Sequence, residues 1–183
     1  ATDFMSQYEI LPGEYLLQEL STFPDWVIRI GIIRTLGKMR LYKRKAIPYF
    51  IQTLGDSQQE VCQSALITLN KVGPPSSDST SEIIPLLRDS SWRVRAYAAL
   101  ALGQIETHSR ELREKIIDAL ISVLFDPELD VRFRSAEALG NIGAAAKKSI
   151  PYIEESLNML SNSIVTEEME RVLEILKKSS KSD

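Results

Sequence analysis

Cysteine and histidine are almost missing from this sequence, which has one of each among its 183 residues, Cys62 and His108. A single cysteine excludes an internal disulfide and a cysteine-rich zinc site, and it favours a reducing, cytoplasmic setting. One histidine cannot form a histidine-rich metal cluster or supply several candidate triads. We therefore expect no catalytic residue, no metal and no cofactor, and we interpret His108 as solvated and Cys62 as a packed thiol.

Long hydrophobic runs, glycine and proline are scarce as well. Because no apolar stretch approaches the roughly 18 residues of a membrane span, we expect neither a span nor a signal segment. Eight glycines and eight prolines are too few for a linker-rich chain. With 44% hydrophobic and 26% charged residues, the composition predicts one globular domain over residues 1–183. The net charge of −3 argues against a strongly electrostatic nucleic-acid binder.

The sequence does contain a repeated pattern with two markers. An Ile or Val recurs at steps of 33, 33 and 37 residues, and a Gly or Asn recurs nine residues later with the same steps. The markers are Ile28, Val61, Val94 and Val131, followed by Gly37, Asn70, Gly103 and Gly140. Two markers that keep one irregular register indicate an internal repeat.

Apolar residues within each repeat have helical spacing. Val94, Ala98, Ala101, Leu102 and Ile105 lie at i, i+4, i+7, i+8 and i+11, which places them on one face of a helix. A shorter apolar segment precedes each such helix, at 47–54, 83–87 and 116–124. An Asp between the two segments supplies turn and N-cap chemistry.

Pairs of helices that recur in this way predict an all-α superhelix, or solenoid, of about five helical hairpins. We expect repeats at 14–39, 46–73, 81–105 and 113–143, with a degenerate C-terminal cap at 149–178. Polar segments at 74–81 and 106–110 are expected to form surface loops, and Pro85 is expected to shorten its helix.

The segment from Asp89 to Ile105, Asp-Ser-Ser-Trp-Arg-Val-Arg-Ala-Tyr-Ala-Ala-Leu-Ala-Leu-Gly-Gln-Ile, resembles a HEAT repeat. It is similar to the short variety also found in phycobilisome-lyase-like proteins, and the segment from Asp126 to Gly143 resembles it equally well. The resemblance extends over roughly residues 14–160 and implies a HEAT-repeat solenoid. It specifies the fold and not the function, because this repeat serves many unrelated tasks.

The resemblance also implies a role for an arginine directly after the Ile or Val. In HEAT-like repeats this arginine commonly pairs with the inter-helix Asp of a neighbouring repeat, so we expect a structural ladder here, with ligand contact as the alternative. Cys62 fills the same position in repeat two and interrupts the series. The expected ladder residues are Arg29, Arg95 and Arg132 with Asp56, Asp89 and Asp126.

The second helix of each hairpin is expected to line the concave face, the usual binding surface of this architecture. Segments 26–40, 58–72, 91–105 and 129–142 contain nine Arg or Lys against three acidic residues, a net charge of +6. Aromatic residues beside arginines are typical of binding hot spots, although packing between repeats is the alternative for each aromatic residue, Trp26 included. The candidate partner-binding residues are Arg34, Lys38, Trp92, Arg93, Tyr97, Phe133 and Arg134.

The sequence thus favours a non-catalytic scaffold that binds a protein or peptide, with an acidic segment, through a basic concave face. Two alternatives stay open, and both come from the resemblance. One is nucleic-acid binding by the concave face, as in HEAT-like DNA glycosylases. The other is a lyase or accessory function for a tetrapyrrole-binding protein.

Overall fold

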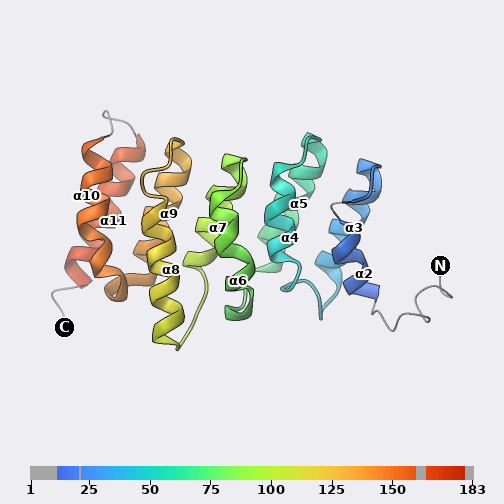
Figure 1. The fold of residues 1–183 in the computed structure, drawn as a ribbon, viewed down its shortest axis with the longest axis horizontal. Coiled ribbons are helices and arrows are strands. Elements are labelled where there is room, and N and C mark those ends of the chain that lie inside the picture. Colours follow the sequence, from blue (N-terminus) through green and yellow to red (C-terminus); the bar gives the residue numbers. More distant parts are fainter. Residues whose placement is uncertain (1–11, 21, 160–163, 180–183) are drawn as a thin grey trace. The chain divides into compact units, whose positions relative to one another are not determined.

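The computed structural model describes residues 12–20, 22–159 and 164–179, which form helices and turns without a β-strand. The chain divides into two compact units, residues 1–74 and residues 75–183. Both units are built from helical hairpins, which confirms the predicted all-α repeat fold (Figure 1). That all 183 residues form a single domain stays a prediction.

Two hairpins make up the described part of the first unit. Helix α2 (Pro12–Glu19) packs on α3 (Trp26–Lys38). Helix α4 (Ile47–Gln52), extended by the 3-10 turn η1 (Thr53–Gly55), packs on α5 (Gln59–Val72). The second helices of the two hairpins, α3 and α5, also pack on each other, as a repeat stack requires.

The second unit contains the hairpins α6–α7, α8–α9 and α10–α11. Its second helices α7, α9 and α11 pack in sequence as one layer, and the first helices form the other layer (Figure 1). Its elements are η2 (Ser77–Ser79), α6 (Thr80–Ile83), η3 (Ile84–Arg88), α7 (Trp92–Gly103), α8 (Arg110–Ser122), α9 (Leu129–Ile142), η4 (Gly143–Ser149), α10 (Ile150–Asn158) and α11 (Ile164–Ser179).

Local chemistry sets several of these helix ends. Asp25 caps α3 by accepting a hydrogen bond from the amide of Val27 at 2.8 Å, and Ser109 caps α8 in the same way. Pro85 follows the four-residue helix α6, and the chain continues as a 3-10 turn because proline cannot donate to the helix. Gly73 and Gly143, with φ of 84° and 72°, end α5 and α9 in a conformation that favours glycine.

The repeated glycines mark the places where second helices approach each other most closely. A Cβ added to Gly37 would lie 2.4 Å from the Thr68 side chain of α5. A Cβ at Gly103 would lie 2.5 Å from Cα of Ala138 in α9. Both distances are far below van der Waals contact, so these backbones pack closely only because the side chain is absent.

The repeated Ile or Val position is the centre of the core in three repeats and not in the first. Val61, Val94 and Val131 are fully buried, but Ile28 is 43% exposed. Ile28 lies near the start of α3, and among the described residues no second helix precedes α3 to cover this side of it.

Candidate functional site

The predicted ladder residues come together once in each unit. In the first unit, Nε and Nη2 of Arg29 donate to both carboxylate oxygens of Asp56 at 2.8 and 2.9 Å. In the second, Nε and Nη2 of Arg95 reach Asp126 at 2.7 and 2.9 Å. The remaining guanidinium nitrogen, Nη1, donates to two backbone carbonyls of the turn that precedes each arginine. Each arginine therefore joins its own turn to the next repeat.

The Arg95–Asp126 ion pair is largely shielded from water. Side-chain exposure is 13% for Arg95 and 7% for Asp126. The hydrogen bond to Asp126 raises the pKa of Arg95 above its ordinary value, although burial acts in the opposite direction. Bidentate geometry and burial make this contact a structural one, since its donors are already used within the fold.

The other ladder positions differ from these two pairs. The Sγ atom of Cys62 lies 3.4 and 3.3 Å from the carbonyl oxygens of Leu54 and Asp56, so the thiol contacts the turn that an arginine would contact. Asp89 accepts a hydrogen bond from the amide of Ser91 at 2.8 Å within its own turn. Arg132 donates through Nε to the carbonyl of Asp126 and not to a carboxylate.

One stripe of each second helix in the second unit faces solvent. The residues of this stripe are spaced three or four apart and are at least partly exposed, and the α7 and α9 members are equivalent repeat positions. We call the stripe the second-helix face. It consists of Arg93, Tyr97 and Leu100 on α7 with its C-cap residue Gln104, Asp130, Arg134, Glu137 and Asn141 on α9, and Glu168, Arg171 and Ile175 on α11.

Two arginines of the second-helix face each lie over a neighbouring aromatic ring. The guanidinium carbon of Arg93 is 5.1 Å from the ring centre of Trp92, and that of Arg134 is 5.2 Å from the ring centre of Phe133. Both distances are within the range of cation–π contacts. The structure thus brings four of the predicted residues together as two pairs, and it places Tyr97 on the same stripe as Arg93.

The two candidates in the first unit, Arg34 and Lys38, occupy one side of α3. They are four residues apart, both are exposed, and Lys38 ends the helix. Lysine near a helix C-terminus is favoured by the helix dipole. Trp26, at the start of the same helix, is 40% exposed, so packing between repeats does not bury it.

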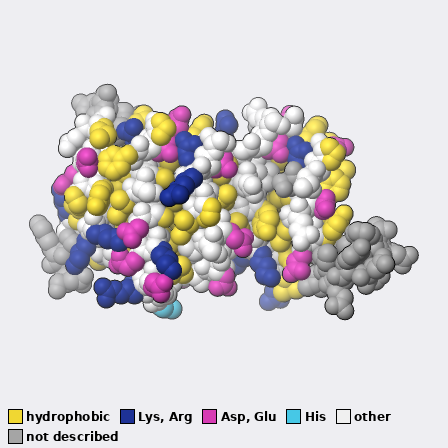
Figure 2. Space-filling model, viewed as in Figure 1, with side chains coloured by type: hydrophobic (Ala, Val, Ile, Leu, Met, Phe, Trp, Pro, Cys, Tyr) yellow, Lys and Arg dark blue, Asp and Glu magenta, His cyan; other side chains and the backbone are white. Residues whose placement is uncertain are grey.

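The surface charge of the second helices is smaller than the sequence count indicates. Arg29 and Arg95 form ion pairs with the largely shielded Asp56 and Asp126, and Arg134 pairs with Glu137 at 2.8 Å on the second-helix face itself. Sequence reasoning missed the Arg134–Glu137 pair, although its i, i+3 spacing was a signal for it. Figure 2 shows the opposite, first-helix layer, where acidic and basic side chains are mixed.

Catalytic and metal-binding arrangements do not emerge from the described residues. Within them, no group of three or more His, Cys, Asp or Glu side chains could hold a metal ion, and no helix is long and apolar enough to cross a membrane. His108 is exposed in the turn before α8. A pocket in the first unit is lined by Leu20, Tyr49, Gln52, Thr53, Gly55 and Asp56.

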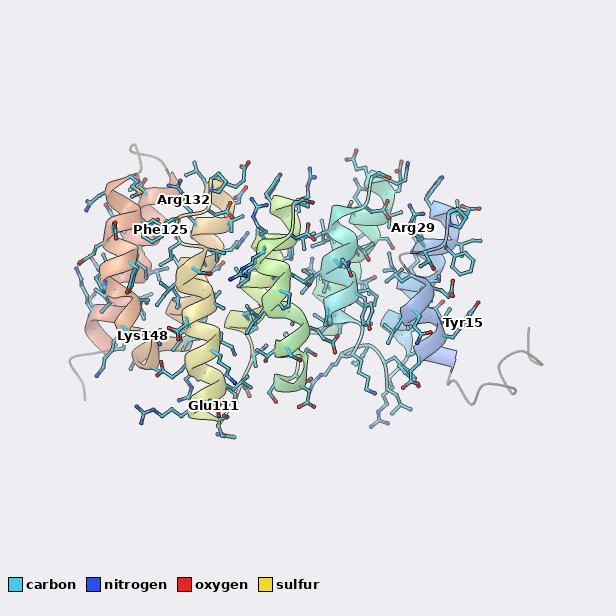
Figure 3. All side chains as sticks on the ribbon, in the orientation of Figure 1. Tyr15, Arg29, Glu111, Phe125, Arg132 and Lys148 are labelled. Atoms are coloured by element: carbon cyan, nitrogen blue, oxygen red, sulfur yellow. The ribbon has the colours of Figure 1, made fainter. Side chains whose placement is uncertain are left out.

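Charged groups outside the second-helix face stabilise the packing of the hairpins. Lys148 of η4 pairs with Asp118 at 2.7 Å and with Glu114, both on α8, and these hydrogen bonds raise the pKa of Lys148 (Figure 3). On the surface of α8, a hydrogen bond from Lys115 lowers the pKa of Glu111. Both are ordinary surface ion pairs with no catalytic geometry.

Hairpins with buried Arg–Asp pairs, glycine contacts and stacked second helices define the class of helical-repeat proteins. The family model described as HEAT repeats matches residues 80–174, which is more than half of the chain. The chain therefore belongs to the HEAT-repeat family. No curated protein matches the sequence.

Solved structures show the same fold at low identity. The complex of CpcE and CpcF of phycocyanin lyase from Nostoc sp. PCC7120 matches with a TM-score of 0.60 and 15% identity, over 87% of this chain and 96% of that chain. Computationally designed armadillo repeat proteins for modular peptide recognition match with 0.51 and 21%, over 87% and 80%. An engineered protein matches with 0.52 and 21%, over 90% and 47%. Identities this low establish the fold alone.

Proposed function

We propose that this protein is a non-catalytic scaffold that binds a partner protein through the second-helix face, and that the partner supplies a short acidic segment. The observation that carries the proposal is the pair of arginine–aromatic stacks, Arg93 on Trp92 and Arg134 on Phe133. An arginine positioned over a ring can present donors to a carboxylate while the ring offers apolar surface beside it.

The composition of the second-helix face favours a peptide that has both apolar and acidic side chains. Tyr97 and Leu100 are partly exposed between the charged residues, so they can contact aliphatic or aromatic side chains of the partner. Glu137 already neutralises part of the charge of Arg134, so one or two carboxylates fit this surface better than a polyanion. Arg34 and Lys38, both exposed on α3, remain candidate partner-binding residues of the first unit by itself.

Nucleic-acid binding has less support than peptide binding. Asp130 is exposed and Glu137 partly exposed on the stripe that contains Arg134, and both would repel a phosphate backbone. The tetrapyrrole-related alternative is supported by the fold likeness to the phycocyanin lyase complex alone, and no further feature of the second-helix face favours it. The designed armadillo proteins show that a fold of this class serves peptide recognition in another protein.

A selection from displayed random peptides tests the proposal directly. We expect the enriched peptides to carry Asp or Glu next to aliphatic or aromatic residues, because those groups match the arginine–aromatic stacks. The double variant Arg93→Glu and Arg134→Glu should weaken a selected peptide about tenfold or more, since it replaces two attractions by repulsions.

The control is Arg110→Glu, which makes one such charge reversal at an exposed position of α8 in the first-helix layer and is compared with each single variant, Arg93→Glu and Arg134→Glu, as well as with the double variant. It should leave peptide affinity unchanged. Enrichment of basic or purely apolar peptides would contradict the proposal. An equal loss of affinity in Arg110→Glu would contradict the assignment of the face.

A further inference from the structure

Three arginines occupy one repeat position, and the last of them uses its guanidinium differently. Arg29 and Arg95 each donate hydrogen bonds from Nε and Nη2 to the carboxylate of the aspartate in the next repeat. Arg132 donates through Nε to the carbonyl of Asp126. Among the residues that the structure describes, neither Nη1 nor Nη2 of Arg132 has a hydrogen-bond or ion-pair partner.

The reason is visible in the sequence of the fifth repeat. The inter-helix aspartate stands five residues before the repeated Val in repeats two, three and four. The corresponding stretch before α11 is Met-Leu-Ser-Asn-Ser at 159–163, which contains no acidic residue. Arg132 therefore keeps the position of a carboxylate-binding arginine, but the equivalent stretch 159–163 has no aspartate, and no described residue supplies a carboxylate to it.

Exposed apolar side chains accompany Arg132. Phe125 is 37% exposed and Leu129 is 43% exposed, and Leu129 lies one helical turn before Arg132 on α9. Figure 3 shows Phe125 and Arg132 near the same end of the α8–α9 hairpin. Met159, the C-cap residue of α10, is 59% exposed. Phe125 and Met159 lie on inter-helix turns, and Leu129 and Arg132 lie in the first turn of α9, so none of the four belongs to the second-helix face.

We propose that Nη1 and Nη2 of Arg132 bind the aspartate side chain of a partner protein, and that Phe125, Leu129 and Met159 contact an apolar residue next to that aspartate. The chain itself contains the pattern of such a ligand. The aspartates gripped by Arg29 and Arg95 both follow a leucine by two residues, in Leu54-Gly55-Asp56 and Leu124-Phe125-Asp126. A partner with a Leu-x-Asp segment at the end of a helix would supply the aspartate that the fifth repeat lacks.

The local charges select one carboxylate over a polyanion. Glu128, the N-cap residue of α9, and Asp130, in the first turn of α9, are both exposed and close in sequence to Arg132. They would repel a phosphate chain, whereas a single aspartate pairs with the planar guanidinium group through two parallel hydrogen bonds. The ligand is thus a protein side chain and not a nucleic acid.

Nuclear magnetic resonance of the full chain tests this site with a defined probe. The probe is a synthetic peptide with the sequence of residues 118–127, which ends in Leu-Phe-Asp-Pro, and its control carries Asn in place of the aspartate. We expect the aspartate peptide to shift the guanidinium signals of Arg132 in a saturable manner. The asparagine peptide should bind about tenfold more weakly, because it lacks the charge-assisted hydrogen bonds.

Variants separate this site from the proposed function. Arg132→Gln should abolish saturable binding of the aspartate peptide, and Arg132→Lys should weaken it, since lysine keeps the charge without the two parallel donors. The Arg93→Glu, Arg134→Glu double variant should bind the probe normally. The result for Arg132 would therefore stand even if the second-helix face bound no partner. Unchanged guanidinium signals, equal binding of both peptides, or binding retained in folded Arg132→Gln would overturn the inference.

Discussion

Residues that recur once per repeat in this protein determine how closely the neighbouring helix can pack. Gly103 is the clearest example, because any side chain there would meet the backbone of α9 at Ala138. Gly31 is a contrast: it lies inside α3 and is exposed, and a Cβ added there would meet no neighbouring group within 4 Å. The same residue type thus has opposite energetic roles at the two positions.

Substituting each glycine with alanine should therefore change stability in opposite directions. Gly103→Ala should lower the free energy of unfolding by about 1–3 kcal/mol, because the two helices must separate or strain to admit the methyl group. Gly31→Ala should raise it by about 0.5–1 kcal/mol, since alanine favours the helix and costs less backbone entropy. Urea denaturation of both variants measures the difference. Stabilisation by Gly103→Ala would show that α7 and α9 are not in close contact.

The arginine of the ladder position contributes through a pair and not by its charge alone. Removing either partner of Arg95–Asp126 leaves the other partly buried with unsatisfied hydrogen-bonding groups. We expect Arg95→Gln and Asp126→Asn each to lower the free energy of unfolding by about 2 kcal/mol. The double variant should lose less than the sum of the two, because the second substitution breaks nothing further.

The exposed pair Lys115–Glu111 on α8 provides the control cycle. Its side chains are 62% and 80% exposed, so solvent screens the attraction and the coupling should be much smaller than for Arg95–Asp126. Additive losses in the Arg95–Asp126 cycle, measured by denaturant unfolding, would mean that the pair does not stabilise the junction between the hairpins.

At the level of helices, periodicity predicted the second helices of the third and fourth hairpins. The apolar spacing from Val94 to Ile105 and from Val131 to Ile142 predicted α7 and α9, and Pro85 predicted the short α6. These features depend on interactions within a few residues, which a sequence displays directly. The exposure of Ile28 could not be predicted in this way, because it depends on which helices are present beside α3.

The candidate site was harder to predict than the helices. The sequence placed Arg93 and Arg134 beside Trp92 and Phe133, and the structure shows the stacking. The charge count overestimated the basic surface, since it did not subtract arginines that are paired inside the fold or with Glu137. Pairing depends on the three-dimensional neighbours of each group, and one sequence contains that information only indirectly.

Repeat two differs from the others at two positions where residues join neighbouring hairpins, the arginine position and the glycine position. Cys62 stands in the arginine position and Asn70 in the glycine position, and the first compact unit ends four residues later, at Pro74. Each unit contains one buried Arg–Asp pair of its own. Repeat two therefore lacks the arginine and the glycine just before the boundary of the first unit, and in the second unit Arg132 of repeat four has no carboxylate partner among the described residues.

For the whole molecule, the central claim is that the protein binds a protein segment and not a nucleic acid. The chain has a net charge of −3, and the basic residues of the second-helix face are accompanied by acidic ones. Duplex binding weakens as a steep power of salt concentration, scaling with the phosphates contacted. A peptide held partly by aromatic contacts should depend on salt less, because only its charged contacts are screened.

The most direct measurement is a salt titration of fluorescence anisotropy with two labelled ligands, a DNA duplex and a peptide enriched in the selection. We predict weak duplex binding at about 150 mM salt, and peptide binding with a shallow salt dependence that is lost in the Arg93→Glu, Arg134→Glu double variant. Tight duplex binding under these conditions, independent of DNA sequence and abolished by the same two substitutions, would contradict the claim and assign the second-helix face to nucleic acid.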